Sequence, residues 1–219
     1  MEEKAPTAVP IFPTMLYRAR APINIVNDDI FDKIDSLPYK HHKGWQPGDS
    51  EGELSQSTKV LTEYDFLESI KIWLDVQIIN AFDSWGLIKS ATPYVTQSWF
   101  TRSAKGETIH KHSHPNSILS GVLYINAVKD YDCLMLQKPG WEIQYSYPYL
   151  HYRDGNEETE FSATMVQCQV QSGDLLIFPS HITHWFNQVE HDQTRISLAF
   201  NTFIKGTLGD DESLTLLEI

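Results

Sequence analysis

The chain has 219 residues, a formal net charge of -12 and a sequence pI near 5.1. This acidic balance argues against a protein that coats nucleic acid or anionic membrane, because phosphate binding needs a concentrated positive surface. Hydrophobic residues make up 41% of the chain, which is enough to build a real core. The length most simply predicts a single domain over residues 1–219.

Cysteine usage and the first residues bear on the cellular compartment. Cys133 and Cys168 are too few for a zinc cluster or a dense disulfide framework. The opening MEEKAPTAVPIF lacks the basic and apolar regions of a secretory signal, and no run approaches the ~18 apolar residues of a membrane span. We therefore expect a cytoplasmic protein with no nucleic-acid or membrane partner.

Residues 1–90 are predicted to form an N-terminal extension with two helices. In NDDIFDKIDSL, Asn27 or Asp28 can cap a short helix, and the following residues 38–57 are rich in Pro, Gly, Ser and charge, which predicts an exposed loop. The strongest helix pattern covers 65–86 and ends at Gly86. Its apolar residues recur at spacings of three and four, namely Leu67, Ile70, Leu74, Ile78, Ala81, Phe82 and Trp85.

From Pro93 onward, short β-branched and aromatic runs alternate with turn residues, as in YVTQSWFT, SGVLYIN, DLLIFPS and ISLAFNTF. This texture predicts a β sandwich or barrel over 91–205, with the helices packed on its outside. The tail 206–219 either adds a last strand or packs across the barrel. The aromatic-rich stretch 138–155 falls between strands, where a lid over a pocket and a separate hydrophobic cluster are equally compatible with its residues.

Histidines recur at every second position in HKHSHPNSILSGVLYIN, residues 110–126. Side chains two apart on a strand point the same way, so neighbouring pairs among these three histidines can share one metal ion. Two imidazoles leave a divalent ion under-coordinated, and a third ligand is available in GDLLIFPSHITHWF at His181 or His184.

The residues alone leave two registers open for the first pair, His110 with His112 or His112 with His114. We expect no metal at four other histidines, which more often are surface or core residues: His41, His42, His151 and His191.

Three blocks, HSHPNSILSGVLYIN, DLLIFPSHITHWF and TRISLAFNTF, together resemble the Fe(II)- and 2-oxoglutarate-dependent oxygenases. They are most similar to a putative oxygenase group of marine bacteria and their phages, which would put a phage-encoded copy in the host cytoplasm. The resemblance covers roughly residues 94–204. It implies a mainly β jelly roll, the cupin-like double-stranded β-helix, with flanking α-helices.

Carried over by position, the resemblance implies a metal site at His112, His114 and His184, and it favours His184 over His181. It also implies that Arg195 anchors the 2-oxoglutarate carboxylate, since a guanidinium binds a carboxylate with two parallel hydrogen bonds. Ser197 and Tyr124 are expected to contact the same cosubstrate. The chain departs from the family at His114, where most members have Asp or Glu.

The implied activity is oxidative decarboxylation of 2-oxoglutarate to succinate, coupled to C–H hydroxylation of an unknown small-molecule or peptidyl substrate. No residue is expected to act as a general acid or base. One alternative is a cupin-like three-histidine dioxygenase or isomerase in which Arg195 binds the substrate's own carboxylate. Another is a β-sandwich module that is not an enzyme.

Overall fold

The computed structural model describes residues 13–41, 50–86, 91–140 and 163–219. The strands are β1 Tyr17–Arg20, β2 Tyr39–Lys40, β3 Glu53–Ser55, β4 Ala91–Ser103, β5 Ile109–His112, β6 Leu119–Asn126, β7 Cys133–Gln137, β8 Met165–Gln169, β9 Asp174–Pro179, β10 Thr183–Phe186, β11 Arg195–Leu208 and β12 Leu217–Glu218. The helices are α1 Asp28–Asp35, α2 Val60–Glu63, a 3-10 turn Asp65–Leu67, and α3 Glu68–Ser84. None of the helices in these ranges is long and apolar enough to cross a membrane.

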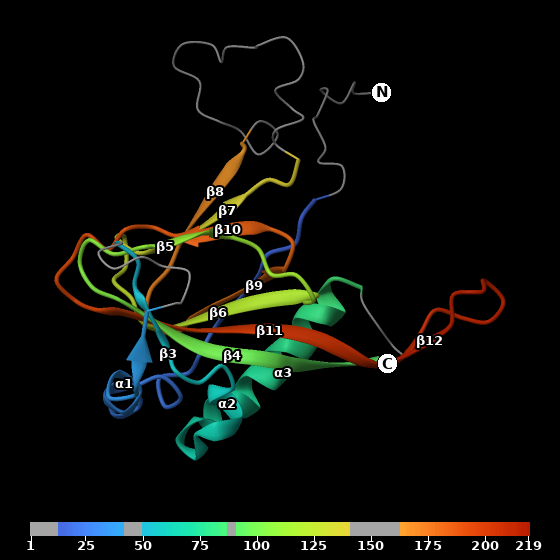
Figure 1. The fold of residues 1–219 in the computed structure, drawn as a ribbon, viewed down its shortest axis with the longest axis horizontal. Coiled ribbons are helices and arrows are strands. Elements are labelled where there is room, and N and C mark those ends of the chain that lie inside the picture. Colours follow the sequence, from blue (N-terminus) through green and yellow to red (C-terminus); the bar gives the residue numbers. More distant parts are fainter. Residues whose placement is uncertain (1–12, 42–49, 87–90, 141–162) are drawn as a thin grey trace, which may run out of the picture.

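The strands form two antiparallel sheets that lie one above the other (Figure 1). The larger sheet has the order β1-β9-β6-β11-β4-β3-β2, with β12 attached to β11, and the smaller has the order β5-β10-β7-β8. The eight strands from β4 to β11 divide between the sheets as β4, β6, β9, β11 and β5, β7, β8, β10. Four strands in each sheet with these crossovers make a jelly roll. The predicted mainly β double-stranded β-helix is confirmed.

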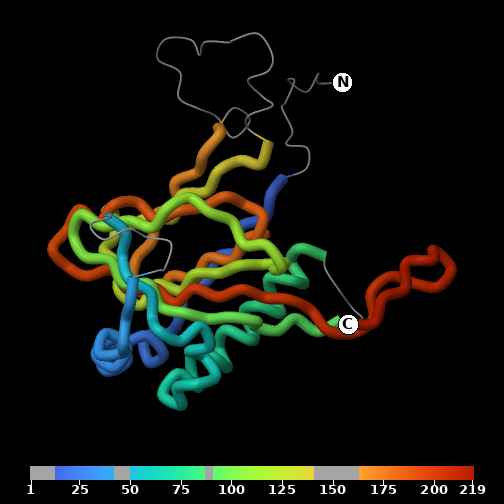
Figure 2. The backbone as a smooth tube through the Cα atoms, in the orientation of Figure 1, coloured from blue at the N-terminus to red at the C-terminus, as the bar shows by residue number. Residues whose placement is uncertain are grey.

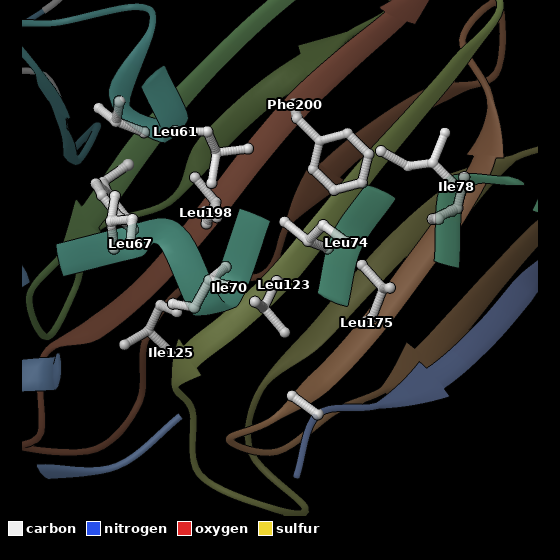
Figure 3. Close-up of a cluster of buried hydrophobic side chains, with 14 of the residues drawn as sticks. Leu61, Leu67, Ile70, Leu74, Ile78, Leu123, Ile125, Leu175, Leu198 and Phe200 are labelled. Atoms are coloured by element: carbon white, nitrogen blue, oxygen red, sulfur yellow. The ribbon is translucent and has the colours of Figure 1, made fainter. Parts of the chain in front are cut away.

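Helix α3 covers the outer face of the larger sheet. Its buried residues Ile70, Leu74 and Ile78 point toward Leu123 of β6, Leu175 of β9, and Leu198 and Phe200 of β11 (Figure 3). The predicted apolar face of this helix is confirmed except at Trp85, which is 37% exposed. Trp85 is the C-cap residue, beyond the last turn that the sheet can cover.

The first 86 residues contain more structure than their sequence predicted. Asn27 caps α1 by accepting a hydrogen bond from the Ile30 N–H at 3.0 Å, as expected. The exposed loop predicted over 38–57 is wrong where β2 pairs with β3 and where Ser55 is buried; residues 42–49 lie outside the described ranges. β1 pairs with β9, and α2 adds a helix to the two expected. These strands are short, so their alternation is too brief to be visible in the sequence.

Strand β11 presents two different faces because side chains alternate along a strand. Ile196, Leu198 and Phe200 belong to the core beneath α3. Ala199 and Asn201 line a cavity on the opposite side, between the two sheets, and Phe200 borders this cavity as well. One strand therefore contributes both to the main core and to the interior in which the candidate site lies.

Candidate metal centre and active site

Three histidines meet at one end of the interior. His112 ends β5, His114 follows two residues later, and His184 lies on β10, directly opposite His112 in the β5–β10 pairing. Their ligand atoms all lie within 4.8 Å of one another. The ring centroids of His112 and His184 are 4.3 Å apart, and that of His114 lies 4.8 Å from the first and 5.1 Å from the second. This geometry suits one metal ion.

Backbone carbonyls orient two of the imidazoles. Nδ1 of His112 lies 2.8 Å from the His110 carbonyl oxygen, and Nδ1 of His184 lies 2.9 Å from that of Ile182. A carbonyl only accepts, so these contacts assign the proton of each neutral ring to Nδ1. The lone pair then remains on Nε2, where it is available to a metal ion.

Burial keeps the histidine cluster neutral. It lowers the pKa of His184 to about 3 and the pKa of His114 to about 4, and the pKa of His112 is lowered for the same reason. The neighbouring imidazoles lower these pKa values further. A metal ligand must be deprotonated, so the cluster is ready to bind a cation at neutral pH. Within the described ranges, no Asp or Glu belongs to the group.

The other histidines lie elsewhere. His110 is half-exposed beside Glu51, and His181 is exposed, so neither joins the cluster. His41 is also exposed. His42 and His151 lie outside the described residues, as does almost all of the 138–155 stretch.

A cavity of about 470 Å³ adjoins the three histidines. Aromatic rings dominate its wall, from Trp99 on β4, Phe178 on β9, and Trp185 and Phe186 on β10. The Trp99 ring lies 5.6 Å from that of His114. Most of the lining surface is apolar, and two of the polar residues, Ser120 and Asn201, hydrogen-bond to each other at 2.7 Å. The cavity therefore offers mostly apolar contact near the metal end.

Arg195 lies buried next to this cavity, with 2% of its surface exposed. Its Nη1 donates to Oδ1 of Asp132 at 3.1 Å and to Oδ1 of Asn187 at 3.0 Å. Its Nη2 has no hydrogen-bond partner among the described residues. The guanidinium carbon lies 5.1 Å from the ring centroid of Phe186, which lines the cavity wall.

Asp132 is the counter-ion of Arg195, and sequence reasoning missed it. Its other carboxylate oxygen accepts hydrogen bonds from Nε2 of His191 at 2.9 Å and from the Val128 N–H at 2.8 Å. His191, expected to bind no metal, is thus a hydrogen-bond partner of this carboxylate. Asn187 was missed as well. The one sequence signal for Asp132 was its position, an acidic residue in a turn directly before the apolar strand β7.

Tyr124 supplies a second unpartnered donor. Its side chain is fully buried, its hydroxyl has no hydrogen-bond partner in the described ranges, and its ring lies 6.0 Å from that of Phe186. Burial raises the pKa of Tyr124 well above its usual value, so it remains a donor. An unsatisfied buried donor costs about 1–3 kcal/mol. Arg195 Nη2 and the Tyr124 hydroxyl together fit a carboxylate, which accepts through two oxygens.

Ser197 makes a hydrogen bond within the protein. Its hydroxyl lies 2.5 Å from that of Thr101 on β4, and the Ser197 side chain is buried. Thr101 lines the cavity, whereas Ser197 lies behind it. The Ser197 hydroxyl thus has one protein partner, and its expected contact with the cosubstrate stays a prediction.

Residues 97–201 match the sequence model of a family described as putative 2OG-Fe(II) oxygenase. No curated protein sequence matches the chain. Among solved structures, a Pseudomonas putida prolyl-4-hydroxylase is similar at 13% identity and a TM-score of 0.55, covering 86% of this chain and 92% of that one.

Two further structures share the fold. HygX from Streptomyces hygroscopicus with nickel and 2-oxoglutarate bound is 9% identical with a TM-score of 0.57, over 86% of this chain and 82% of that one. A 2OG-Fe(II) oxygenase family oxidoreductase from Burkholderia pseudomallei is 11% identical with a TM-score of 0.53, over 80% and 75%. At these identities the likeness concerns the jelly-roll fold.

Proposed function

We propose, on the premise that residues 97–201 belong to the putative 2OG-Fe(II) oxygenase family, that this 2-oxoglutarate-dependent dioxygenase is a hydroxylase. Its metal ligands are His112, His114 and His184. The observation that carries the proposal is the pairing of this neutral cluster with two buried, unpartnered donors, Arg195 Nη2 and the Tyr124 hydroxyl. The first site suits a cation, and the second suits a carboxylate.

Fe(II) bound by these residues would use dioxygen to couple oxidative decarboxylation of 2-oxoglutarate with hydroxylation of a substrate C–H bond. One oxygen atom would enter succinate, released with carbon dioxide, and the other would enter the new hydroxyl group. The chain's own part is binding and orientation. The two Nδ1 contacts direct Nε2 of His112 and His184 toward the ion. Arg195, held by Asp132 and Asn187, presents its remaining edge to the cosubstrate carboxylate.

The substrate approaches through the cavity. Trp99, Phe178 and Trp185 favour a substrate that presents an apolar group to the metal end, since burying a polar group there without a partner costs free energy. The same walls exclude water from the reacting groups, which limits side reactions. No histidine or carboxylate needs to transfer a proton to the substrate in this scheme.

The test is an anaerobic titration of purified protein with Fe(II) and then 2-oxoglutarate. We expect a weak visible absorption band that neither component gives alone, because the cosubstrate and the ion then share one centre. His184→Ala should lose bound iron, measured by metal analysis after gel filtration. His181→Ala is the matched control, because His181 is three positions from His184 but exposed, and this variant should retain iron.

Two outcomes would contradict the proposal. If no band forms although iron is bound, the chain does not take 2-oxoglutarate, and a three-histidine enzyme acting on a carboxylate substrate becomes the better reading. If His184→Ala retains as much iron as His181→Ala, the ligand assignment is wrong. Tyr124→Phe keeps the size of the side chain and should weaken 2-oxoglutarate binding without loss of iron.

A further inference from the structure

The C-terminal hairpin extends away from the body of the protein. β11 continues past the sheet to Leu208, and the last residues of the chain pair with it at Gly206, Thr207 and Leu208 (Figures 1 and 2). We call residues 209–219 the arm. Its aliphatic side chains are exposed, with Leu214 at 93% and Leu217 at 53% of their surface. A two-stranded hairpin is only marginally stable in water unless it packs on something.

A groove with an apolar floor lies on the same molecule, between α3, α2 and the first half of β4. Its volume is about 520 Å³. Leu61, Ile78 and Val95 form part of its lining, together with Ile79 and Tyr94, which remain 46% and 41% exposed. Large side chains exposed side by side around a groove are typical of an interaction surface.

The groove also has an open strand edge. On one side β4 pairs with β11 from Ala91 onward. On the other side, within the described ranges, β3 pairs with β4 only at Thr101 and Arg102, and a single bridge joins Lys59 to Ser98. The backbone of residues 94–97 is therefore accessible to an added extended segment, a common mode of peptide recognition. The arm contains such an extended segment at its end, where Leu217 and Glu218 form β12.

Charge matches the arm to the groove. Lys59 and Lys71 line the groove; Lys71 pairs with Asp75 at 2.6 Å, whereas Lys59 has no acidic partner among the described side chains. The arm carries Asp211 and Glu212, which have no basic partner in the part of the chain that the structure describes. An acidic and aliphatic arm thus complements a basic and apolar groove in one sequence.

We propose that the arm of one copy binds in the groove of a second copy, and that the exchange is reciprocal. Leu214, Leu216 and Leu217 then cover Ile79 and Tyr94, and the acids of the arm approach Lys59. In a single chain the arm points away from α3 and leaves the groove uncovered (Figure 1). Reciprocal exchange covers both grooves and both arms, and it gives a closed dimer with two-fold symmetry. This inference does not depend on the proposed oxygenase activity.

The first test compares the full chain with a chain that ends at Leu208, by sedimentation equilibrium over a range of concentrations. We expect a dimer for the full chain and a monomer for the shortened one. Leu217→Asp should raise the dimer dissociation constant at least tenfold. Ile23→Asp replaces a side chain that is 86% exposed but belongs to neither the groove lining nor the arm, and it should leave the constant unchanged.

The second test separates arm from groove. Ile79→Asp damages the groove and keeps the arm, whereas the chain ending at Leu208 lacks the arm and keeps the groove. Each should be monomeric alone, yet an equimolar mixture should form a one-to-one dimer through the one intact pair. Lys59→Glu should weaken the dimer, and Asp211→Lys with Glu212→Lys should restore it in the same chain.

Three results would overturn the proposal: a full chain that stays monomeric, a dimer that survives removal of the arm, or a mixture that does not associate. A monomer whose arm resists proteolysis would mean that the arm binds its own groove. Circular dichroism spectra that match the wild type show that each variant is folded, so that loss of the dimer reports on the surfaces.

Discussion

The histidine cluster and the Arg195 cluster lie in the same jelly roll, yet they handle charge differently. At the metal end, burial holds three imidazoles neutral, and no acid of the described residues joins them. At the other end, Arg195 is paired with Asp132, which also binds His191. One cluster gains a charge when it binds a cation; the other keeps its charges and leaves two donors for an anion.

The difference explains how one interior can bind ligands of opposite charge. A neutral cluster avoids the free-energy cost of burying cations before the metal arrives. A paired guanidinium has already offset that cost, and only its Nη2 edge still lacks a partner. The comparison therefore predicts that removal of a charge lowers the free energy of unfolding most at the Arg195 cluster. A change of pH should affect it most through the histidines.

The largest effect is expected for Asp132→Asn, which keeps the side chain's size but leaves Arg195 as an unpaired buried cation. Breaking a buried pair in this way costs about 3–5 kcal/mol. The free energy of unfolding in urea should fall by that order. Asp192→Asn removes an exposed acid paired with Lys105 and should change it little. Equal stability of the two variants would show that the Arg195 cluster is not held by charge pairing.

The next effect concerns pH. In the metal-free protein the pKa of His184 is about 3, whereas an unfolded histidine titrates near 6.5. Below pH 6.5 the unfolded state binds a proton that the folded state excludes, so stability falls as pH falls. Between pH 7 and pH 5, His184 should account for a loss of about 2 kcal/mol.

Urea unfolding with a chelator present measures this loss. His184→Phe should show a smaller pH dependence than the wild type over the same interval. His181→Ala, which removes an exposed histidine, should show the wild-type dependence. If His184→Phe and the wild type lose stability in parallel, the cluster is not kept neutral by burial.

Tyr124→Phe tests the Arg195 cluster as a site for the 2-oxoglutarate carboxylate. The Tyr124 hydroxyl is buried without a partner, so its removal should leave the free energy of unfolding unchanged or raise it by up to about 1 kcal/mol. The dissociation constant for 2-oxoglutarate, measured by calorimetry with Mn²⁺ in place of iron, should rise on the order of tenfold. An unchanged constant would remove Tyr124 from the proposed anchor.

The smallest effect is expected for Ser197→Ala. It removes the hydrogen bond to Thr101 and should lower the free energy of unfolding by about 1 kcal/mol. Because Ser197 already has this partner, 2-oxoglutarate affinity should stay at the wild-type value. A clear loss of affinity would instead support the cosubstrate contact that the family resemblance implied.

Sequence patterns predicted the parts of the protein that repeat or alternate. The long apolar face of α3 and the β runs after Pro93 were visible because each extends over several periods. The histidine triplet stood out because its members are two residues apart and a second pair follows downstream. The resemblance to the Fe(II)- and 2-oxoglutarate-dependent oxygenases, which rested on three such blocks, is confirmed over residues 97–201 by the match to a putative 2OG-Fe(II) oxygenase family.

Contacts made across long loops could not be predicted in this way. Asp132 lies in the turn before β7, 63 residues from Arg195, and nothing in its neighbourhood marks it as a counter-ion. Its role arises because the turn before β7 and the first residue of β11 meet in space. The partner of Ser197 was missed for a similar reason, since it depends on the register of β4 against β11, which pairs Ser197 with Thr101.

The two faces of β11 have a consequence for engineering. Ile196 and Leu198 pack beneath α3, Ala199 and Asn201 shape the cavity, and Phe200 contributes to both. Thermostability can be sought by repacking the helix side, and substrate scope by varying the cavity side, in separate libraries. An insertion or deletion within this strand would exchange the two sets of side chains, so length variants belong in the loops on either side of it.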